Sequence, residues 1–296
     1  MKRTLTLLWL LAMLMPCVVF GKNKKQNQEE QYKVAACDWM MLKRQKLGAF
    51  KLSHEIGADG VELDMGGLGK RDTFDNKLRQ EVNHKIFQDE AAKYEVEVPS
   101  MAMSGFFAQS FLTKATYREL IIDCLRSMEV MGAKVAFLPF GGIQEDWRVA
   151  GPARDELVRR LHVAGELAAE QGKVIGIRTA LPAQENIKLL KEVDSKGIKI
   201  YYNLQDAVDN GWDVYKDIKK LGKKNIAQIH ASLTDSVTLD QDPRIDMYKV
   251  KETLDKMKWS GWLVVERSRN ARETRNVKKN YGTNVAYLKK IFQGKE

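Results

Sequence analysis

Cysteine is scarce in this chain. Only three of its 296 residues are cysteines, and none of their spacings matches a zinc finger or a C-x-x-C redox motif. Cys17 lies in an apolar N-terminal run, Cys37 falls in a predicted strand, and Cys124 lies on the apolar face of a predicted helix. We therefore predict two separate buried thiols in the mature chain rather than a disulfide.

Several motifs that mark common enzyme classes are also missing. The glycine-rich stretch 66–69 does not follow the dinucleotide-binding fingerprint, and the glycine pair at 141–142 lacks the lysine and hydroxyl residue of a phosphate-binding loop. No serine lies in the G-x-S-x-G turn of a serine hydrolase. Histidine is rare as well, and of the four present only His230 comes late in a predicted strand. The sequence thus gives no sign of a nucleotide-dependent enzyme or of a nucleophilic serine.

The N-terminus has the pattern of a secretory signal peptide. A basic start at Lys2 and Arg3 precedes an apolar stretch, and the sequence turns sharply polar after Gly21. We predict cleavage after Gly21, and hence an exported protein, periplasmic or secreted, with no stable membrane anchor once residues 1–21 are removed. Retention of the apolar run as an anchor is the alternative. The polar leader 22–32 is predicted to be disordered.

The mature chain is basic without a concentrated basic segment. Without Lys2 and Arg3 it holds 47 basic against 39 acidic residues, a net charge of +8. The basic residues are spread over predicted helices, as in KDIKKLGKK and RNVKKN, where solvated helix faces account for most of the excess. An anionic ligand, such as a phosphate or an acidic sugar, stays open.

From Lys33 onward, short apolar runs alternate with amphipathic segments. We predict eight strands, at 33–38, 60–64, 97–102, 134–139, 174–179, 198–204, 226–231 and 262–267. A helix is predicted after each strand, at 48–56, 84–95, 116–131, 153–171, 184–194, 213–221, 246–257 and 283–292. This alternation predicts a parallel (β/α)8 barrel, or TIM barrel, as a single α/β domain over residues 33–296.

Polar or aromatic residues come at or near the end of most predicted strands. In the second half these are Arg178, Asn203, His230 and Glu266, and in the first half they include Asp38, Trp39, Glu62, Phe106, Phe107 and Phe140. The C-terminal ends of the strands carry the active site in such barrels, because the loops there vary without disturbing the packed core. We therefore expect these side chains to converge on one site.

The strand regions resemble those of a known family. The runs GADGVELDMGGL, KVAFLPFGG, EQGKVIGI, IYYNLQDAVDNG, KNIAQIHASL and WSGWLVVERS occur in this order and spacing. Together they resemble the xylose-isomerase-like TIM barrels, a superfamily of sugar isomerases, sugar 3-epimerases and endonuclease-four-like enzymes. The resemblance covers about 33–292 and implies a barrel that acts on a sugar or a sugar derivative.

The resemblance also implies a divalent metal site, which this sequence alters. Members commonly hold the metal with a glutamate ending strand five, an aspartate ending strand six, a histidine ending strand seven and a glutamate ending strand eight. His230 and Glu266 match, but Arg178 and Asn203 stand in the other two positions. Arginine keeps its proton and offers no ligand lone pair, so we expect no cofactor. A divalent ion (Mn, Mg or Zn) held by His230 and Glu266, with a further ligand such as Asp206, stays open as the alternative.

The implied chemistry is proton removal next to a carbonyl of a sugar or keto-sugar. We assign Glu62 or Glu266 as the base and His230 as the proton partner. Arg178 is expected to hold the enolate oxygen and to pair with Glu266.

The remaining candidates are substrate-binding residues. Sugars stack on aromatic rings, and the predicted aromatic wall consists of Trp39, Phe106, Phe107 and Phe140. The predicted polar contacts are Asp38, Asn203 and Asp206. The expected partner is a small sugar or sugar derivative.

Three functions stay open. The first is isomerisation or epimerisation, and the second is the lyase or hydratase reaction of a 3-keto-glycoside in glycan breakdown. The third is a non-catalytic sugar-binding barrel with a decayed metal site. Nucleic acid is not expected as a partner, because the endonuclease-like members have richer His/Glu metal clusters than the four histidines here supply. A homo-oligomer stays open.

Overall fold

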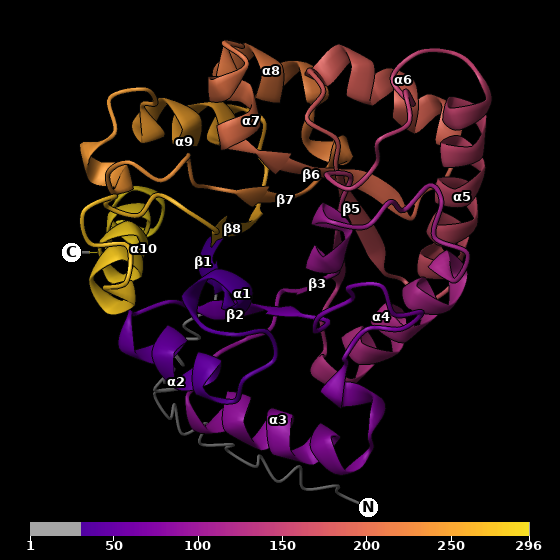
Figure 1. The fold of residues 1–296 in the computed structure, drawn as a ribbon. Coiled ribbons are helices and arrows are strands. Elements are labelled where there is room, and N and C mark those ends of the chain that lie inside the picture. Colours follow the sequence, from indigo (N-terminus) through magenta and orange to yellow (C-terminus); the bar gives the residue numbers. More distant parts are fainter. Residues whose placement is uncertain (1–30, 296) are drawn as a thin grey trace, which may run out of the picture.

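The computed structural model describes residues 31–295, which form a closed barrel of eight parallel strands (Figure 1). The strands are β1 (Tyr32–Cys37), β2 (Gly60–Asp64), β3 (Ser100–Ala102), β4 (Val135–Pro139), β5 (Val174–Arg178), β6 (Ile198–Asn203), β7 (Ile226–His230) and β8 (Gly261–Val265). Each strand pairs with the next one in the chain, and β8 pairs with β1 to close the ring. The predicted (β/α)8 barrel is therefore confirmed. The predicted signal peptide, and the leader as far as residue 30, lie outside the described residues.

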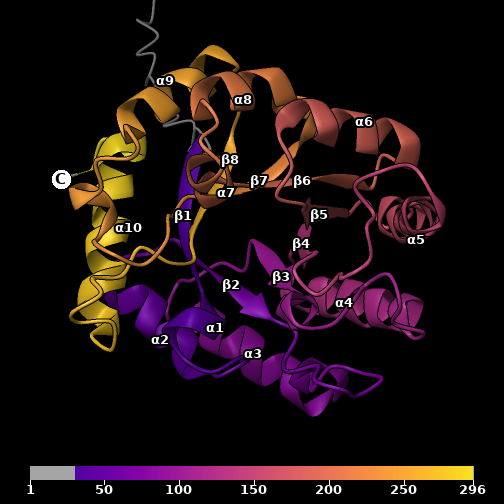
Figure 2. The same cartoon turned by 45° about the horizontal axis from the view of Figure 1, so that its top comes forward.

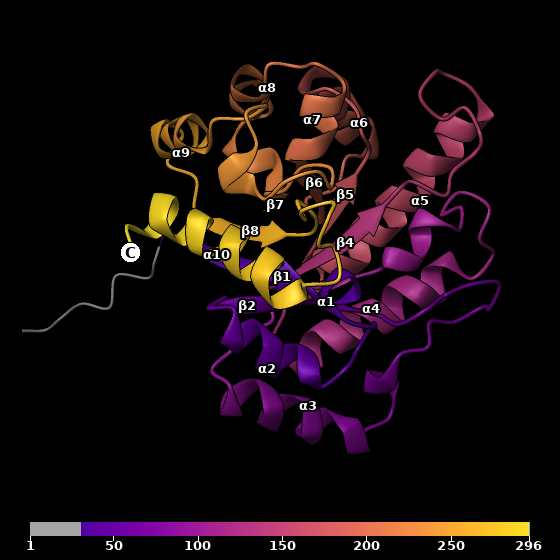
Figure 3. The ribbon, with the colours of Figure 1, turned by 60° about the vertical axis from the view of Figure 1, so that its left-hand side comes forward.

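Helices cover the outside of the ring, as Figures 1 and 2 show. The larger ones are α2 (Gly48–Glu55), α3 (Val82–Lys93), α4 (Tyr117–Met131), α5 (Pro152–Ala169), α6 (Ala183–Val193), α8 (Val214–Leu221), α9 (Met247–Lys256) and α10 (Val277–Gln293). Two short helices, α1 (Asp38–Met41) and α7 (Leu204–Asp209), follow β1 and β6 directly and were not predicted. The C-terminal helix α10 lies against β1, so it covers the place where the barrel closes (Figure 3). Among residues 31–295, no helix has the length and apolar content that crossing a membrane requires.

Two predicted boundaries differ from the structure by several residues. β3 begins at Ser100 instead of residue 97, because Pro99 has no N–H to donate to a neighbouring strand. The segment before it makes only an isolated bridge, through Glu97. α10 begins at Val277 instead of residue 283, with Asn276 as its N-cap.

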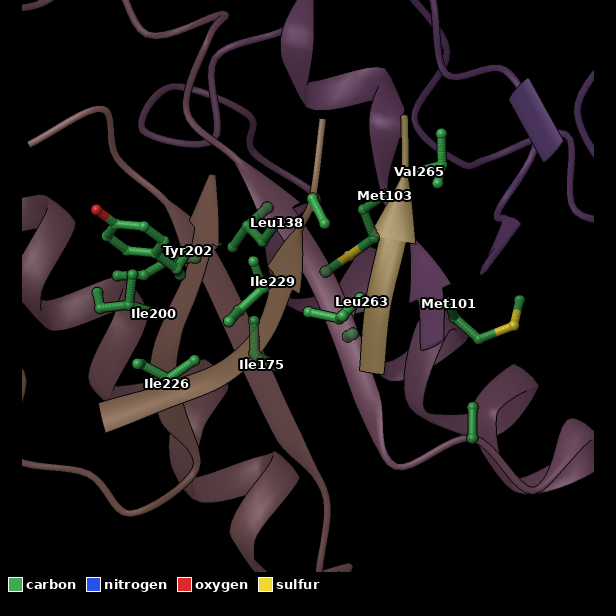
Figure 4. Close-up of a cluster of buried hydrophobic side chains, with 14 of the residues drawn as sticks. Met101, Met103, Leu138, Ile175, Ile200, Tyr202, Ile226, Ile229, Leu263 and Val265 are labelled. Atoms are coloured by element: carbon green, nitrogen blue, oxygen red, sulfur yellow. The ribbon is translucent and has the colours of Figure 1, made fainter. Parts of the chain in front are cut away.

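Side chains along each strand alternate between the outside and the inside of the barrel. Figure 4 labels several of the buried residues that pack between the strands and the helices: Met101, Leu138, Ile175, Ile200, Ile226, Ile229, Leu263 and Val265. A smaller cluster lies inside the barrel and contains Ala35, Cys37, Ala102, Phe137, Tyr201 and Val264. Cys37 thus lies in the inner cluster and Cys124 in the outer core. Both are free and buried, as predicted.

An irregularity in β7 decides which of its side chains enter the barrel. Consecutive residues of β6 pair with Ile226 and Gln228, so Ala227 is an extra residue in β7. Ile226 and Ile229 consequently both face the outer core, whereas His230 contacts the rings of the inner cluster. The bulge therefore restores an inward orientation to the last residue of the strand.

Candidate active site

Glu62 of β2 is the deepest charged group of the site and is fully buried inside the barrel. Its Oε1 lies 2.9 Å from Nε2 of His230, and its Oε2 accepts hydrogen bonds from Ser100 Oγ (2.7 Å) and Tyr201 Oη (2.6 Å). Three donors therefore satisfy the carboxylate, as a buried charge requires. Burial and the charge of Glu62 raise the pKa of Tyr201 well above its ordinary value, so its hydroxyl remains a donor.

The contact with Glu62 determines the form of the His230 ring. Because the carboxylate accepts, the neutral imidazole carries its hydrogen on Nε2 and presents the lone pair of Nδ1 on its other side. Both oxygens of Glu62 are occupied, and the residue is 0 % exposed. The structure thus places Glu62 beneath His230, where it positions that ring, and its role as a general acid or base stays a prediction.

Glu266, which follows β8, lies on the other side of the imidazole. Three nitrogen atoms surround its Oε2: Arg178 Nη1 at 3.3 Å, Asn203 Nδ2 at 3.4 Å and His230 Nδ1 at 3.6 Å. The predicted pair of Arg178 and Glu266 is thus confirmed. The side chains of Glu266 and Arg178 are only 4 % and 14 % exposed. All three distances are long for hydrogen bonds, so Glu266 itself is held only loosely by these neighbours.

Arg178 has a second carboxylate partner. Asp206, in the first turn of α7, accepts hydrogen bonds from Nε at 2.9 Å and from Nη2 at 2.7 Å, which is a bidentate pair. Burial opposes the charge of Arg178, but the hydrogen bonds to Asp206 and the charge of Glu266 outweigh it and raise the pKa of Arg178 above its ordinary value. Arg178 is therefore a permanent cation held between two carboxylates.

The start of α7 also orients the amide of Asn203. Its Oδ1 accepts a hydrogen bond from the backbone N–H of Gln205 at 2.9 Å, as an N-cap. Because the oxygen is used there, Nδ2 is the group that faces Glu266. Asn203 therefore offers the site a hydrogen-bond donor and not a ligand oxygen.

The four side chains at the strand ends do not fit a resident divalent metal. These are Arg178, Asn203, His230 and Glu266. Arg178 and Asn203 present N–H groups, and Asp206, the further ligand considered, is bound to the guanidinium. His230 Nδ1 and Glu266 remain, which is fewer than the protein ligands that usually hold such an ion. Within residues 31–295, no group of three or more His, Cys, Asp or Glu side chains is arranged to hold a metal ion.

Two of the four predicted aromatic residues line the site. The rings of Trp39 and Phe137 are stacked with their centroids 6.1 Å apart, and the Phe107 ring lies 5.8 Å from that of Phe137. The guanidinium carbon of Arg178 lies 5.6 Å from the centroid of Phe107. Trp39 and Phe107 are both partly exposed, which leaves ring surface on which a sugar can stack. Phe137, which joins them, was not predicted.

The structure places the other two predicted aromatic residues away from this aromatic group. Phe106 is fully buried and makes an edge contact with Phe111, while Phe140 packs on Phe111 and Trp147. All of them belong to the outer core. Phe106 and Phe107 lie in a 3-10 turn (Ser104–Phe107) after β3, in which successive side chains point about 120° apart, so Phe106 faces the outer core where Phe107 faces Arg178.

The structure places Asp38, which was predicted to contact the substrate, among backbone N–H groups below the surface. It is fully buried, and its carboxylate accepts hydrogen bonds from the backbone N–H groups of Gln45 (2.8 Å) and Asp64 (3.1 Å). Burial and the charge of Asp64 raise the pKa of Asp38 well above its ordinary value, and burial raises the pKa of Asp64 to about 7. Arg44 pairs with Asp64 at 3.2 Å. Asp38 therefore secures the loops after β1 and β2.

The chain belongs to the xylose isomerase-like TIM barrel family, whose sequence pattern matches residues 50–291. A similar solved structure is the 3-keto-D-glucoside 4-epimerase of E. coli, with a TM-score of 0.68 and 15% identity over 87% of this chain and 99% of that one. D-psicose 3-epimerase also has a TM-score of 0.68, with 10% identity over 88% of this chain and 99% of that one. L-ribulose 3-epimerase has the same TM-score, with 12% identity over 89% of this chain and 95% of that one. Identities this low show the fold alone, and no curated protein matches the chain.

Proposed function

We propose that this chain is a sugar isomerase or epimerase-like enzyme that removes a proton next to a carbonyl of a sugar or keto-sugar. The observation that carries the proposal is the set of groups around one carboxylate oxygen of Glu266: an imidazole lone pair and the N–H donors of Arg178 and Asn203, all within 3.6 Å. A base, a proton carrier and donors for a developing oxyanion are what enolate formation needs. The similar epimerases act on sugars, which supports this substrate class.

Glu266 is the proposed base. It takes the proton from the carbon next to the carbonyl, the C–H electron pair forms a C=C bond, and the carbonyl π pair moves to the oxygen. Arg178 and Asn203 donate hydrogen bonds to that oxygen, because their long contacts with Glu266, 3.3 and 3.4 Å, are readily exchanged for shorter ones. His230 Nδ1 carries a proton to and from a substrate hydroxyl while Glu62 holds the ring.

The enolate can react in two ways. Return of the proton to a ring carbon gives isomerisation or epimerisation, which is the proposed reaction. Expulsion of an oxygen from the next carbon makes the protein a lyase of 3-keto-glycosides, and the reverse step makes it a hydratase. One observation favours this second candidate. Arg178 stands where relatives have another carboxylate, so one carboxylate base acts with His230 at 3.6 Å, which suffices for elimination.

Deuterium exchange tests the proposal. The purified protein is incubated in deuterated water with aldoses, ketoses and 3-keto-glycosides, with and without a chelator, and the sugars are followed by proton NMR. We expect deuterium to enter next to the carbonyl at a rate that the chelator does not change. Exchange that the chelator abolishes would indicate a metal mechanism. Folded protein without exchange on any sugar would favour the non-catalytic sugar-binding barrel.

We also propose that the protein is exported. The support is the sequence of residues 1–21, with its basic start and apolar stretch. Mass spectrometry of the protein from separated cell fractions would check it. We expect a chain that begins at Lys22 outside the cytoplasm, whereas an intact N-terminus in the cytoplasmic fraction would contradict export.

A further inference from the structure

The charge of Arg178 is more than matched by its neighbours. Asp206 occupies the edge of the guanidinium formed by Nε and Nη2, and Glu266 contacts Nη1. Two carboxylates therefore face one cation, and the group carries a formal charge of −1 before any ligand enters. Below it, Glu62 adds another carboxylate, whose partners are Ser100, Tyr201 and His230.

Three further arginines on the loops at this end of the barrel also have carboxylate partners. These pairs are Arg44 with Asp64, Arg244 with Asp242, and Arg269 with Asp235. Each of these three arginines is therefore already paired with a carboxylate.

Arg178, Asp206 and Glu266 are largely buried, so their net charge acts strongly on a ligand that enters the site. The side chains of Arg178, Asp206 and Glu266 are 14 %, 16 % and 4 % exposed, so solvent and salt screen them less than surface charges. An anion placed beside Arg178 would meet two like charges and would find the bidentate edge of the guanidinium already occupied. The remaining lining, with Trp39, Phe107 and the amide of Asn203, suits hydroxyl groups and an apolar ring face.

We infer that the sugar ring that enters this site is uncharged: a neutral keto-sugar or the terminal residue of a neutral glycoside, and not a sugar phosphate or a uronic acid. The inference rests on the proposed function and names its substrate class. Asp206 is the residue that decides it, because a free guanidinium edge would bind a phosphate or a carboxylate in bidentate fashion.

Inorganic phosphate tests this role of Asp206 without any sugar. Calorimetry at low salt compares the unmodified protein with Asp206→Asn and with Asp209→Asn. Asp209 is the control for the loss of one negative charge, because it lies on the same helix, contacts Thr234 and Arg244, and makes no ion pair with Arg178. We expect Asp206→Asn to bind phosphate at least about tenfold more tightly than the other two proteins. Equal phosphate affinity in all three, or an equal gain in Asp209→Asn, would overturn the assignment to Asp206.

The unmodified protein provides a second test that needs no variant. Binding and deuterium exchange are measured with 3-keto-glucose, 3-keto-glucuronate and 3-keto-glucose 6-phosphate. We expect the neutral sugar to bind about 100-fold more tightly than either anion, because like charges repel strongly in a partly buried contact. Equal or tighter binding of an anion would overturn the inference, including the case in which loop arginines hold it.

The two readouts separate this inference from the proposed function. Preference for the neutral sugar without exchange would leave the charge inference standing and would contradict the enzyme. Equal binding of anionic and neutral sugars, with deuterium exchange in both, would support the proposed enzyme and overturn the charge inference. Failure of all three sugars to bind would overturn both.

Discussion

Two hydrogen-bond networks share the His230 ring and differ in how tightly they are made. On the inner side, Glu62 lies 2.6–2.9 Å from Ser100, Tyr201 and His230, and these side chains are buried. On the outer side, the three nitrogens around Glu266 lie at 3.3–3.6 Å. The inner network is complete without a ligand, whereas the outer contacts are loose enough for a substrate to replace. The difference fits the proposed function, in which the inner network holds the geometry and the outer one makes the contacts with the substrate.

Among changes in the outer network, removal of the proposed base Glu266 should slow deuterium exchange the most. Glu266→Gln keeps the shape of the side chain but cannot take a proton, so we expect deuterium exchange to slow by about 10²–10⁴-fold. The matched control is Glu273→Gln, in the loop after β8, where the carboxylate is 41 % exposed and pairs with Lys279. Its rate should be unchanged. An exchange rate in Glu266→Gln equal to that of the control would remove Glu266 from the mechanism.

Removing the cation should affect both activity and stability. Arg178→Met leaves Asp206 and Glu266 without their partner, and we expect a loss of about 3 kcal/mol in the free energy of unfolding, measured with urea. Exchange should fall by about 10²–10³-fold with the loss of an oxyanion donor. The double variant Arg178→Met with Asp206→Asn should recover most of the stability but not the exchange. Recovery of both would show that Arg178 has only a structural role.

A change in the inner network should slow the reaction less. Glu62→Gln can donate a hydrogen bond to Nε2 of His230, which favours the opposite ring tautomer and removes the lone pair from Nδ1. We expect exchange to fall by about 10–100-fold, as for other groups that orient a functional histidine. The nitrogen chemical shifts of His230 report the tautomer directly. An unchanged tautomer with slower exchange would mean that Glu62 acts through packing alone. The milder comparison is Tyr201→Phe, which removes one hydrogen bond to Glu62 but leaves the contact between Glu62 and His230 Nε2 in place.

The smallest effect is expected at a carboxylate outside both networks. Burial raises the pKa of Asp64 to about 7, above the value of about 4 in an unfolded chain. The folded state therefore binds this proton more tightly, and its stabilising effect is lost as the pH rises from about 4 to about 7. Urea unfolding across this range should show that the decline is shallower in Asp64→Asn. Identical slopes would show that Asp64 does not titrate as its burial suggests.

Much of the fold follows from local sequence. Apolar runs and the amphipathic segments between them place eight strands and their helices, and the position of Arg178, Asn203, His230 and Glu266 at or just after strand ends places all four at the same end of the barrel. The period of two along a strand also contains information that the predictions did not use. It places Tyr201 on the same face of β6 as Asn203.

Other features depend on contacts that no short segment reveals. The inward orientation of His230 requires the extra residue Ala227, and nothing in the run IAQIH indicates a bulge. The pair of Arg178 and Asp206 joins residues 28 apart, and it forms only because α7 begins directly at the end of β6. The role of Glu62 likewise depends on which donors meet it inside the closed ring.

The site is completed only late in folding, when β8 closes onto β1. The bond between Glu62 and His230 spans 168 residues and that between Glu62 and Tyr201 spans 139, while Glu266 comes after the last strand. A nascent or refolding chain that has built its first six strands therefore has neither network complete. Contacts so distant in sequence form late, because long loops must close before they can be made. If the protein has the proposed activity, the first appearance of deuterium exchange during refolding would thus mark the final closure of the barrel.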